Sequence, residues 1–376
     1  MTPFAGRVVV VVSRVGENCP DDCVVLADRS IREAPLSIRG YLRCPAAGRE
    51  VRTRRVTSPA FAAVVPDDSG ARPIESHVAA VESLRLGDGR RLCVRRWPGA
   101  GASTFVFLHG LLDSSEGWSC VADRLTGPQA AFDLPGFGYS DVPPLGSIAA
   151  YVHDVAVGLE MLGIERFMLV GHSLGGAVAA ALAELMPAKV DALVLFAPAG
   201  FGRIGLAEAV SIPGVRNLAE AVLPLALSNR LLVSAGYATM VSNGRAPERE
   251  IVDRVTGRAR ALVAGAREGT RAVVDAGRSR DAFHRRRVDY DGPVCAIWGD
   301  HDRLVPLSHR HGLRVAFPHA RIDVWEGMGH DPLRERPDHV IAVLGAAAAA
   351  IRTRRSQHET ATESSARGHK RRQTTR

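Results

Sequence analysis

Short apolar runs alternate with longer amphipathic stretches over residues 79–351. The apolar runs predict buried β-strands at residues 81–86, 91–97, 104–109, 130–133, 166–171, 190–198, 294–299 and 321–326. A periodicity near 3.6 residues predicts helices at residues 118–125, 147–163, 174–186, 307–317 and 336–351. Apolar strands that alternate with helices indicate an α/β fold, in which a mostly parallel sheet is covered on both faces.

Local signals mark two boundaries in this pattern. Asp88 and Gly89 lie between the first two predicted strands, and this pair is typical of the turn of a β-hairpin. Ser147 comes directly before the amphipathic stretch that ends near residue 163, so we expect it to open that helix.

Both ends of the chain lack the alternation. Residues 1–78 contain Pro, Gly and Arg throughout, and we expect a poorly structured N-terminal extension. Residues 352–376 are polar and rich in Ser, Thr and Arg, which predicts a disordered tail. The formal net charge is +8, and this tail alone contains eight Lys or Arg and two Glu. The core is close to neutral, so the basicity gives no reason to expect specific binding of nucleic acid.

Cysteines and apolar segments give weak information about the cellular location. Six Cys are scattered along the chain, and no second Cys or His pair accompanies Cys19 and Cys23 at zinc-ligand spacing. We therefore expect ordinary thiols and no metal site. The apolar run within residues 7–14 is too short for a signal peptide, and no run of about 18 apolar residues occurs. A soluble cytoplasmic protein is the expectation.

The sequence Gly-His-Ser-Leu-Gly at residues 171–175 lies between a predicted strand and a predicted helix. Two interpretations compete. In the first, this is a plain turn in which Ser173 caps the helix. In the second, it is a nucleophile elbow that holds Ser173 above the edge of the sheet. Gly171 and Gly175 would then relieve crowding across the turn, and the helix N-terminus would direct its free N–H groups at the serine.

A serine hydroxyl is a weak nucleophile, and it needs a base that is itself oriented by an acid. Asp302 follows the strand predicted at residues 294–299, and His330 follows the last predicted strand. Since the C-terminal ends of parallel strands share one edge of a sheet, these side chains are expected to meet Ser173 there. Ser173, Asp302 and His330 are therefore the candidate catalytic residues.

Other residues fit these roles less well. Asp300 precedes the expected position of the acid by two residues. His172 adjoins Ser173, and neighbouring side chains on such a turn point apart. Three more histidines lie near or on a helix that is far from the last strand: His301, His309 and His311.

Acyl transfer also requires donors for an oxyanion. Gly110 follows a predicted strand and allows the chain to turn back over the sheet, so that the backbone N–H of Leu111 can point inward. The backbone N–H of Leu174 is the expected second donor. The glycine-rich loop at residues 133–140 is interpreted as scaffold.

With these segments in place, the chain resembles the α/β-hydrolase fold serine hydrolases, of the capped esterase and C–C hydrolase type. The resemblance covers residues 79–351 and rests on the segments FLHG, DLPGFGYS, VGHSLGG, WGDHDRLVP and GMGHDP, in that order. It implies an eight-stranded sheet with the first hairpin strand antiparallel, built from residues 79–198 and 289–351. It also implies a helical lid, inserted after the sixth strand at residues 199–288.

The expected activity is hydrolysis of a carboxylic ester through an acyl-enzyme, without a metal or an organic cofactor. The expected partner is a small, apolar acyl substrate. A serine at position 173 separates the chain from relatives with an aspartate nucleophile. The resemblance does not separate esterases from thioesterases, amidases, acyltransferases, perhydrolases or hydrolases that cleave C–C bonds of diketone-like compounds. A binding module without catalysis is the remote alternative.

The expected lid has two parts of different composition. Residues 204–237 are rich in Leu, Val and Ala, which fits either the roof of an acyl pocket, with Leu223 and Leu227 as candidates, or ordinary packing. Residues 246–278 contain several Arg at helical spacing, which fits either recognition of an anionic group or a solvated helix face.

Overall fold

The protein is described by a computed structural model. It covers residues 8–12, 23–27, 41–43, 50–52, 79–101, 103–242, 244, 247–278 and 282–373. The chain divides into two compact units, Met1–Glu82 and Ser83–Arg376. Most of the expected N-terminal extension lies outside the described residues.

The N-terminal unit contains a small antiparallel sheet where the sequence pattern led us to expect little regular structure. Its strands, in the order β1-β2-β3-β4, are β1 (Val8–Val12), β2 (Cys23–Ala27), β3 (Tyr41–Arg43) and β4 (Glu50–Arg52). Five consecutive valines form β1, and β-branched residues favour strands. The pattern did not reveal this sheet because the strands have only three to five residues and show no clear alternation.

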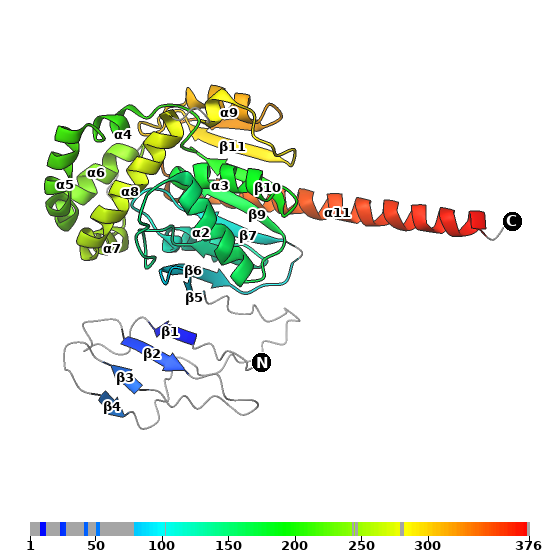
Figure 1. Ribbon diagram of the computed structural model, residues 1–376, viewed down its shortest axis with the longest axis horizontal. Helices are drawn as coiled ribbons and strands as arrows, with labels where there is room; N and C mark the ends of the chain where they lie inside the picture. Colours follow the sequence, from blue (N-terminus) through cyan, green and yellow to red (C-terminus); the bar gives the residue numbers. More distant parts are fainter. Residues whose placement is uncertain are drawn as a thin grey trace. The chain divides into compact units, whose positions relative to one another are not determined.

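The second unit is built on an eight-stranded sheet with the order β12-β11-β10-β9-β7-β8-β6-β5 (Figure 1). Its strands are β5 (Ala80–Arg85), β6 (Arg91–Trp97), β7 (Thr104–Leu108), β8 (Gln129–Phe132), β9 (Phe167–His172), β10 (Val190–Phe196), β11 (Val294–Gly299) and β12 (Arg321–Trp325). All the pairs from β8 through β7, β9, β10 and β11 to β12 are parallel. The expected eight-stranded, mostly parallel sheet is confirmed.

One detail of the hairpin differs from the expectation. The strand that runs antiparallel to its neighbour β8 is β6, the second strand of the hairpin, rather than the first. The turn itself is as predicted, because Gly89 has φ 84° and donates its N–H to the carbonyl of Leu86. A tight hairpin reverses the chain, so β5 opposes β6 and runs in the same direction as β8.

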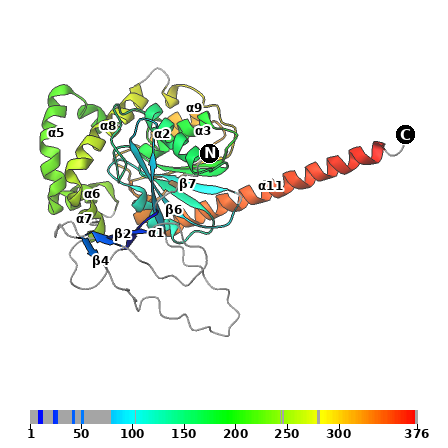
Figure 2. The same ribbon diagram turned by 60° about the horizontal axis from the view of Figure 1, so that its bottom comes forward.

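Helices cover both faces of the sheet. Outside the segment between β10 and β11, they are α1 (Ser119–Ala122), α2 (Ile148–Met161), α3 (Leu174–Leu185), α9 (His309–Ala316), α10 (Pro332–Glu335) and α11 (Pro337–Gln373). Short 3-10 helices occupy Ser115–Trp118 and Phe283–Arg285. Helices α2 and α3 pack together on one side of the strands, and α1 packs with α11 on the other (Figure 2). Ser147 opens α2 as predicted, since its side chain accepts the N–H of Ala150.

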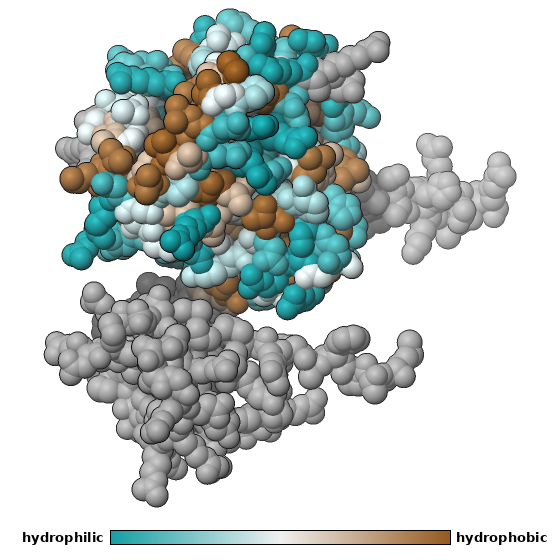
Figure 3. Space-filling model, turned by 60° about the vertical axis from the view of Figure 1, so that its left-hand side comes forward, coloured by the Kyte–Doolittle hydropathy of each residue, from teal (hydrophilic) through white to brown (hydrophobic). Residues whose placement is uncertain are grey.

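Five helices lie between β10 and β11, and we call them the inserted helices: α4 (Gly205–Ala209), α5 (Pro213–Ser228), α6 (Arg230–Met240), α7 (Arg249–Gly257) and α8 (Ala259–Arg278). They lie to one side of the sheet (Figure 1). Large apolar side chains are exposed on α4, α5 and α6 and just before α5: Leu206, Ile212, Val215, Leu218, Val222, Leu225, Leu231 and Leu232. Figure 3 shows apolar surface on this side.

Helix α11 continues through the tail for which the sequence predicted disorder. Its buried residues include Val340, Leu344 and Ile351, which recur at helical spacing. Arg355 then pairs with the Asp191 carboxylate at 2.8 Å. Once a helix is nucleated, each further residue adds one hydrogen bond without a new nucleation cost. The helix therefore extends to Gln373, away from the sheet (Figure 1).

The central strands place strained turns at one edge of the sheet. Every residue of β9 is buried, and so are all but one residue of β7 and of β10. Positive φ angles at non-glycine residues follow these same three strands, at Leu112 (64°), Ser173 (53°) and Ala197 (41°). Such angles are uncommon outside glycine and persist where the surrounding structure holds them. The rigid strands thus define the candidate site at their C-terminal ends.

Candidate active site

Ser173 lies between β9 and α3 with φ 53° and ψ −116°, outside the helical region. Its backbone N–H donates to the carbonyl of Phe196 on β10 at 3.0 Å. Its side chain makes no hydrogen bond that caps α3. The interpretation of Ser173 as an ordinary helix cap therefore lacks its defining contact, and the partly exposed hydroxyl remains available for other chemistry.

The two glycines that flank Ser173 are required by close backbone approach. A Cβ on Gly171 would lie 2.5 Å from the carbonyl oxygen of Gly175. A Cβ on Gly175 would lie 2.2 Å from the carbonyl oxygen of Leu108 on β7. Both obstacles are backbone atoms, so no side-chain movement relieves them. The spacing of glycines at 171 and 175 is thus explained by the sharp turn.

Asp302 and His330 meet at the same edge, although they are 28 positions apart in the sequence. Nδ1 of His330 lies 2.7 Å from Oδ2 of Asp302, and the exposed fractions of the two side chains are 4% and 0%. The other oxygen of Asp302 accepts the backbone N–H groups of Leu304 and Val305, both at 2.9 Å. Since a carboxylate can only accept, Nδ1 of His330 carries the hydrogen in this pair, and Nε2 is the acceptor in the corresponding neutral tautomer.

Backbone contacts join the turn at Ser173 to the loop of His330. Nε2 of His172 lies 2.8 Å from the carbonyl oxygen of His330, and the two rings are 4.9 Å apart between centroids. A Cβ on Gly110 would lie 3.2 Å from the Cβ of Ser173. The loops after β7, β9 and β12 therefore converge around Ser173.

His172 is neutral in this environment. Burial, followed by the nearby His330, lowers the pKa of His172 to about 4. Its Nε2–H is used by the carbonyl of His330, and its Nδ1 has no partner within the described part of the chain. His172 therefore supports the backbone of the candidate base.

The remaining alternatives have other surroundings. Oδ1 of Asp300 accepts the backbone N–H of Gly327 at 2.8 Å, as a turn residue does. The buried His309 lies 3.3 Å from the carbonyl of Arg203, and burial lowers its pKa. His301 and His311 are exposed.

The two expected oxyanion donors belong to the start of α3 and to the loop after β7. Leu174 is the first residue of α3, whose N-terminal N–H groups are not used within the helix. Leu111 follows Gly110, and its side chain packs against α8, where a Cβ on Gly269 would lie 2.5 Å from Leu111 Cδ1. A backbone N–H at a helix start and another on a facing loop are the usual components of an oxyanion hole.

Comparison with known proteins agrees with this architecture. A family profile described as the alpha/beta hydrolase fold matches residues 103–219. An uncharacterised protein of Mycobacterium tuberculosis is 31% identical over 287 residues, which cover 73% of this chain and 82% of the relative. The chain belongs to the α/β-hydrolase fold family.

The relatives of this α/β-hydrolase are named for different activities. A dihydrolipoyllysine-residue acetyltransferase component of an acetoin cleaving system, from Cupriavidus necator, is 31% identical over 74% of this chain and 71% of its own length. A 2-hydroxy-6-oxononadienedioate/2-hydroxy-6-oxononatrienedioate hydrolase from Pseudomonas putida is 26% identical over 62% and 82%, respectively. An esterase structure from Exiguobacterium antarcticum superposes with a TM-score of 0.58 at 18% identity, over 71% of this chain and 98% of the esterase.

The loop at residues 133–140 supports the hydrolase site without facing it. The Asp133 carboxylate is buried and accepts the backbone N–H groups of Ser115 and Tyr139 at 2.7 and 2.8 Å. The backbone N–H of Leu134 donates to Nε2 of His109 at 2.9 Å. These bonds connect residues 133–140 to the loop after β7, which agrees with the interpretation of residues 133–140 as scaffold.

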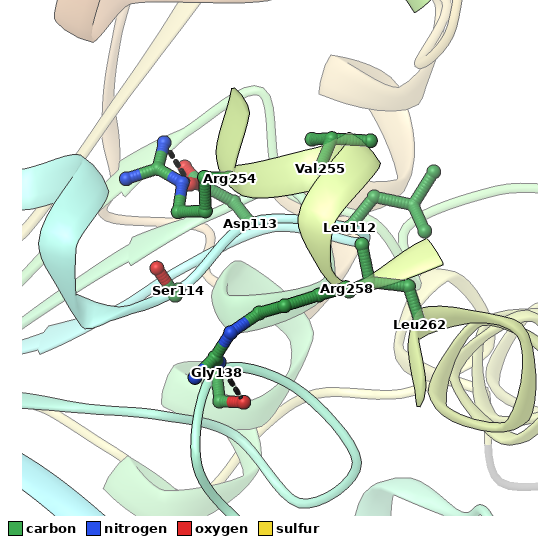
Figure 4. Close-up of a pocket in the computed structure, with 8 residues that line it drawn as sticks. All are labelled: Leu112, Asp113, Ser114, Gly138, Arg254, Val255, Arg258 and Leu262. Atoms are coloured by element: carbon green, nitrogen blue, oxygen red, sulfur yellow. Dashed lines mark hydrogen bonds and ion pairs between the residues drawn. The ribbon is translucent and has the colours of Figure 1, made fainter. Parts of the chain in front are cut away.

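A small, partly open pocket lies between the loop after β7 and the inserted helices. Figure 4 shows Arg254 directed at Asp113, and Arg258 directed at the carbonyl of Gly138. Its lining residues are Leu112, Asp113, Ser114, Gly138, Arg254, Val255, Arg258 and Leu262. The arginines of this segment are thus divided between two environments. Arg254 and Arg258 turn inward, whereas five others are exposed: Arg249, Arg260, Arg267, Arg271 and Arg278.

Sequence analysis missed an ionic cluster that lies beside the site. Arg334 contacts Asp331 at 2.8 Å and Asp113 at 3.6 Å, and Arg254 contacts Asp113 at 3.5 Å. Burial alone would raise the pKa values of Asp113 and Asp331. Arg334 and the other nearby donors and cations together outweigh burial, so both pKa values lie below their usual range. The only sequence signal is the spacing of Asp331 and Arg334 by three residues, which is common on helices.

Two further findings concern ions and membranes. In the described ranges, no group of three or more His, Cys, Asp or Glu side chains is arranged to hold a metal ion. Of the helices in the described ranges, none by itself has the length and hydropathy needed to cross a membrane. Helices α5 and α6 meet that criterion only as a pair, which is bent by 104°.

Proposed function

We propose that this α/β-hydrolase cleaves a carboxylic ester through an acyl-enzyme intermediate. The observation that carries the proposal is the buried His330–Asp302 pair at 2.7 Å, on the same sheet edge as a serine whose side chain does not cap its helix. A buried carboxylate that holds one imidazole nitrogen leaves the other nitrogen as a base. Family membership supports a hydrolase, and the site residues point to the serine mechanism.

In this mechanism, His330 Nε2 takes the proton of the Ser173 hydroxyl as the oxygen attacks the ester carbonyl. The imidazolium is stabilised by Asp302 and then protonates the departing alkoxide, which leaves an acyl group on Ser173. Water, deprotonated by the same Nε2, attacks the acyl group and releases the acid. The proton returns to Ser173, so the enzyme is regenerated.

Charge that develops on the carbonyl oxygen is assigned to the backbone N–H groups of Leu111 and Leu174. Leu174 is at the N-terminus of α3, where the helix dipole adds a partial positive charge. Removal of one such donor in related chemistry costs roughly 10²- to 10³-fold in kcat. The close contact of Leu111 with Gly269 of α8 supports a role for the inserted helices as a lid over the acyl group.

A phosphonate ester probe that reacts with activated serines provides the test. We expect covalent labelling on the peptide that contains Ser173, together with turnover of nitrophenyl esters, and loss of both in Ser173→Ala. Ser308→Ala, which removes an exposed serine at the start of α9, is the matched control and retains both. Label at another residue, or near wild-type turnover by folded Ser173→Ala protein, contradicts the proposal.

Acyl transfer to a thiol is the second candidate. It is favoured by the Cupriavidus necator relative, whose name assigns acetyl transfer to a dihydrolipoyl group. The acyl-enzyme would be the same, and only the acceptor would change from water to a thiol. A transferase forms thioester faster than free acid when dihydrolipoamide is added at millimolar concentration, whereas a hydrolase forms acid at an unchanged rate.

The Pseudomonas putida relative motivates a parallel measurement with a diketone-like substrate. A strict C–C hydrolase turns over such a compound and cleaves nitrophenyl esters poorly. An esterase shows the reverse preference. A protein that only binds ligands turns over neither. The ratio of kcat/KM values for the two substrates therefore distinguishes a C–C hydrolase from an esterase.

A further inference from the structure

The loop that contains His330 is held by the inserted helices. The backbone N–H of His330 donates to the carbonyl oxygen of Met240, the last residue of α6, at 2.9 Å. This loop follows β12 and has no regular backbone pairing of its own there. The position of the candidate base thus depends on a hydrogen bond to a segment about 90 residues earlier in the sequence.

One carboxylate joins the same two segments a second time. Glu335 Oε2 accepts the backbone N–H and the hydroxyl of Ser242, at 2.9 and 2.6 Å. Glu335 also accepts the backbone N–H groups of Gly329 at 3.0 Å and of Asp331 at 3.2 Å, which flank His330. Both neighbours of His330 are therefore bound to a side chain that is bound to the chain just after α6.

A partly buried tyrosine makes the third connection. The hydroxyl of Tyr237 on α6 donates to Oδ2 of Asp331 at 2.6 Å, and Arg334 donates to the same oxygen at 2.8 Å. Burial raises the pKa of Tyr237, so it stays protonated as a donor. Burial opposes the ionised form of Asp331, but Arg334, His172 and the Tyr237 hydroxyl together lower the pKa of Asp331. A charged acceptor makes this bond stronger than one between neutral groups.

The ionic cluster extends these connections to the loop of the proposed oxyanion donor. Arg334 and Arg254 of α7 both lie within 3.6 Å of Asp113, two residues after Leu111. The inserted helices thus contact the loop of the base through α6 and the loop of Leu111 through α7. A movement of these helices would change the surroundings of both loops together.

We propose that Tyr237 and Glu335 are positioning residues for His330, which they hold through the loop in the geometry that lets Nε2 reach Ser173. The inference rests on the proposed function and assigns a task to the inserted helices beyond covering a substrate. When α6 is docked, the loop is complete and the base is aligned. When α6 moves away, the N–H of His330 loses its acceptor, Asp331 loses its hydrogen bond from Tyr237, and hydrolysis stops.

Tyr237→Phe and Glu335→Gln test this proposal. Each removes hydrogen bonds to the loop without removing a group that touches the acyl substrate. Displacement of a catalytic group by about 1 Å can cost 10²-fold, so we expect kcat for a nitrophenyl ester to fall roughly 10- to 100-fold. We expect KM to stay within about twofold of the wild-type value, because neither substitution removes a group that binds the substrate. The rate of phosphonate labelling at Ser173 should fall in parallel with kcat.

Matched controls separate positioning from simple loss of stability. Tyr290→Phe removes another buried tyrosine hydroxyl, which contacts the carbonyl of Val190 at 3.4 Å in the core. Glu184→Gln changes another carboxylate with several donors, from Arg286 and Asp289. At a temperature well below each melting transition, both controls should keep the wild-type kcat.

Amide hydrogen exchange gives a readout that does not depend on turnover. The peptide containing residues 327–331 should exchange faster in Tyr237→Phe and Glu335→Gln than in the wild type or the controls. Faster exchange with a kcat that is unchanged, or an equal loss of kcat in all four variants, overturns the positioning role. A wild-type protein without turnover that depends on Ser173 instead refutes the proposed function itself.

Discussion

The two oxygens of Asp302 have different partners, and this division constrains the tautomer of His330. Oδ1 accepts two backbone N–H groups, from Leu304 and Val305, while Oδ2 faces Nδ1 of His330. Rotation of the carboxylate would break all of these bonds together. The side chain of Asp302 is completely buried, so water cannot replace them.

Asp302→Asn should therefore inactivate the enzyme with little change in fold. The backbone N–H groups would retain the amide oxygen of the new side chain, so its NH₂ group would face Nδ1 of His330. Nδ1 would then become an acceptor and Nε2 would carry the proton. We expect kcat for a nitrophenyl ester to fall roughly 10⁴-fold. Steady-state kinetics and circular dichroism check this, and a loss below tenfold would contradict the assigned role of Asp302.

His172 should make stability depend on pH. Its pKa falls from 6.5 to about 4 on folding because of burial, so the unfolded chain binds more protons between these values. The free energy of unfolding therefore decreases as pH falls from about 6.5 to about 4. The full contribution corresponds to about 3 kcal/mol. It is present at pH above 6.5 and is lost toward pH 4.

His172→Gln isolates this effect, since the amide can still donate to the carbonyl of His330 but does not titrate. Urea unfolding of both proteins at pH 7.5 and pH 5 gives the comparison. We expect a smaller pH-dependent loss in the variant. Identical losses in the two proteins would show that His172 has similar pKa values folded and unfolded.

At the scale of elements, α5 has two apolar sides with different surroundings. Leu227 is buried within the main hydrophobic cluster, and Leu223 packs against that cluster. The opposite side exposes a stripe at helical spacing: Val215, Leu218, Val222 and Leu225. A helix that is apolar on all sides gives no sequence signal for its orientation.

The acyl-length profile of the enzyme should depend on the inward side of α5. An apolar pocket gains about 0.8 kcal/mol per buried methylene, so kcat/KM should rise roughly two- to fourfold per carbon and then fall by clash. We expect Leu223→Ala to shift the optimum to longer acyl groups. Leu225→Ala, at a side chain that is 72% exposed, is the control and should not. An optimum that no substitution of Leu223 or Leu227 moves would assign this side of α5 to packing alone.

Gly329 lies where the loop of His330 approaches α6 most closely. A Cβ at this position would be 2.6 Å from both the carbonyl oxygen of Met240 and the backbone nitrogen of Ser242. Gly329→Ala should therefore push the two segments apart, lower the free energy of unfolding by roughly 1–3 kcal/mol and reduce kcat.

Gly345→Ala provides the comparison, because a Cβ there meets nothing within 4 Å on α11. Alanine is favoured over glycine in a helix by roughly 0.5–1 kcal/mol, so this variant should be at least as stable as the wild type. Thermal melts and ester turnover of Gly329→Ala and Gly345→Ala test these expectations. Equal stability and turnover in Gly329→Ala would mean that the loop tolerates displacement.

At the scale of the whole molecule, the described chain consists of two compact units, and every candidate site residue falls in the second. The positive charge is concentrated elsewhere, toward the C-terminal end of α11. Within that helix, Arg355 pairs with the core through Asp191.

A chain trimmed to residues 79–357 should fold and hydrolyse small esters at the wild-type rate. It keeps all eight strands of the large sheet and the Arg355–Asp191 pair. Loss of the basic end of α11 should weaken binding to heparin at low salt, because such attraction is electrostatic and screened. Circular dichroism, ester kinetics and heparin retention test these points. Loss of turnover in folded trimmed protein would show that one of the removed ends contributes to the site.

Much of this organisation could be predicted from local pattern. Buried parallel strands are continuous apolar runs, and helices have their own period, so the eight strands and the fold class could be predicted before any contact was known. The glycines at 171 and 175 mark a sharp turn, and the order of Ser173, Asp302 and His330 suggests a shared edge. Each of these signals lies within a short, continuous stretch of the chain, and sequence patterns predict structure well over such short stretches.

The sequence by itself determined the order of the eight strands of the large sheet along the chain, the hydrolase resemblance and the candidates Ser173, Asp302 and His330. Tertiary structure alone decided that Met240 and Glu335 bind the loop of His330, that Arg334 lies between Asp331 and Asp113, and which side of α5 faces inward. It also extended α11 through a segment whose composition suggests disorder. The reason is physical: hydrogen bonds and ion pairs between distant segments depend on side chains brought together by packing of the whole chain. The hydrophobic periodicity of one segment does not indicate which distant segment it will contact.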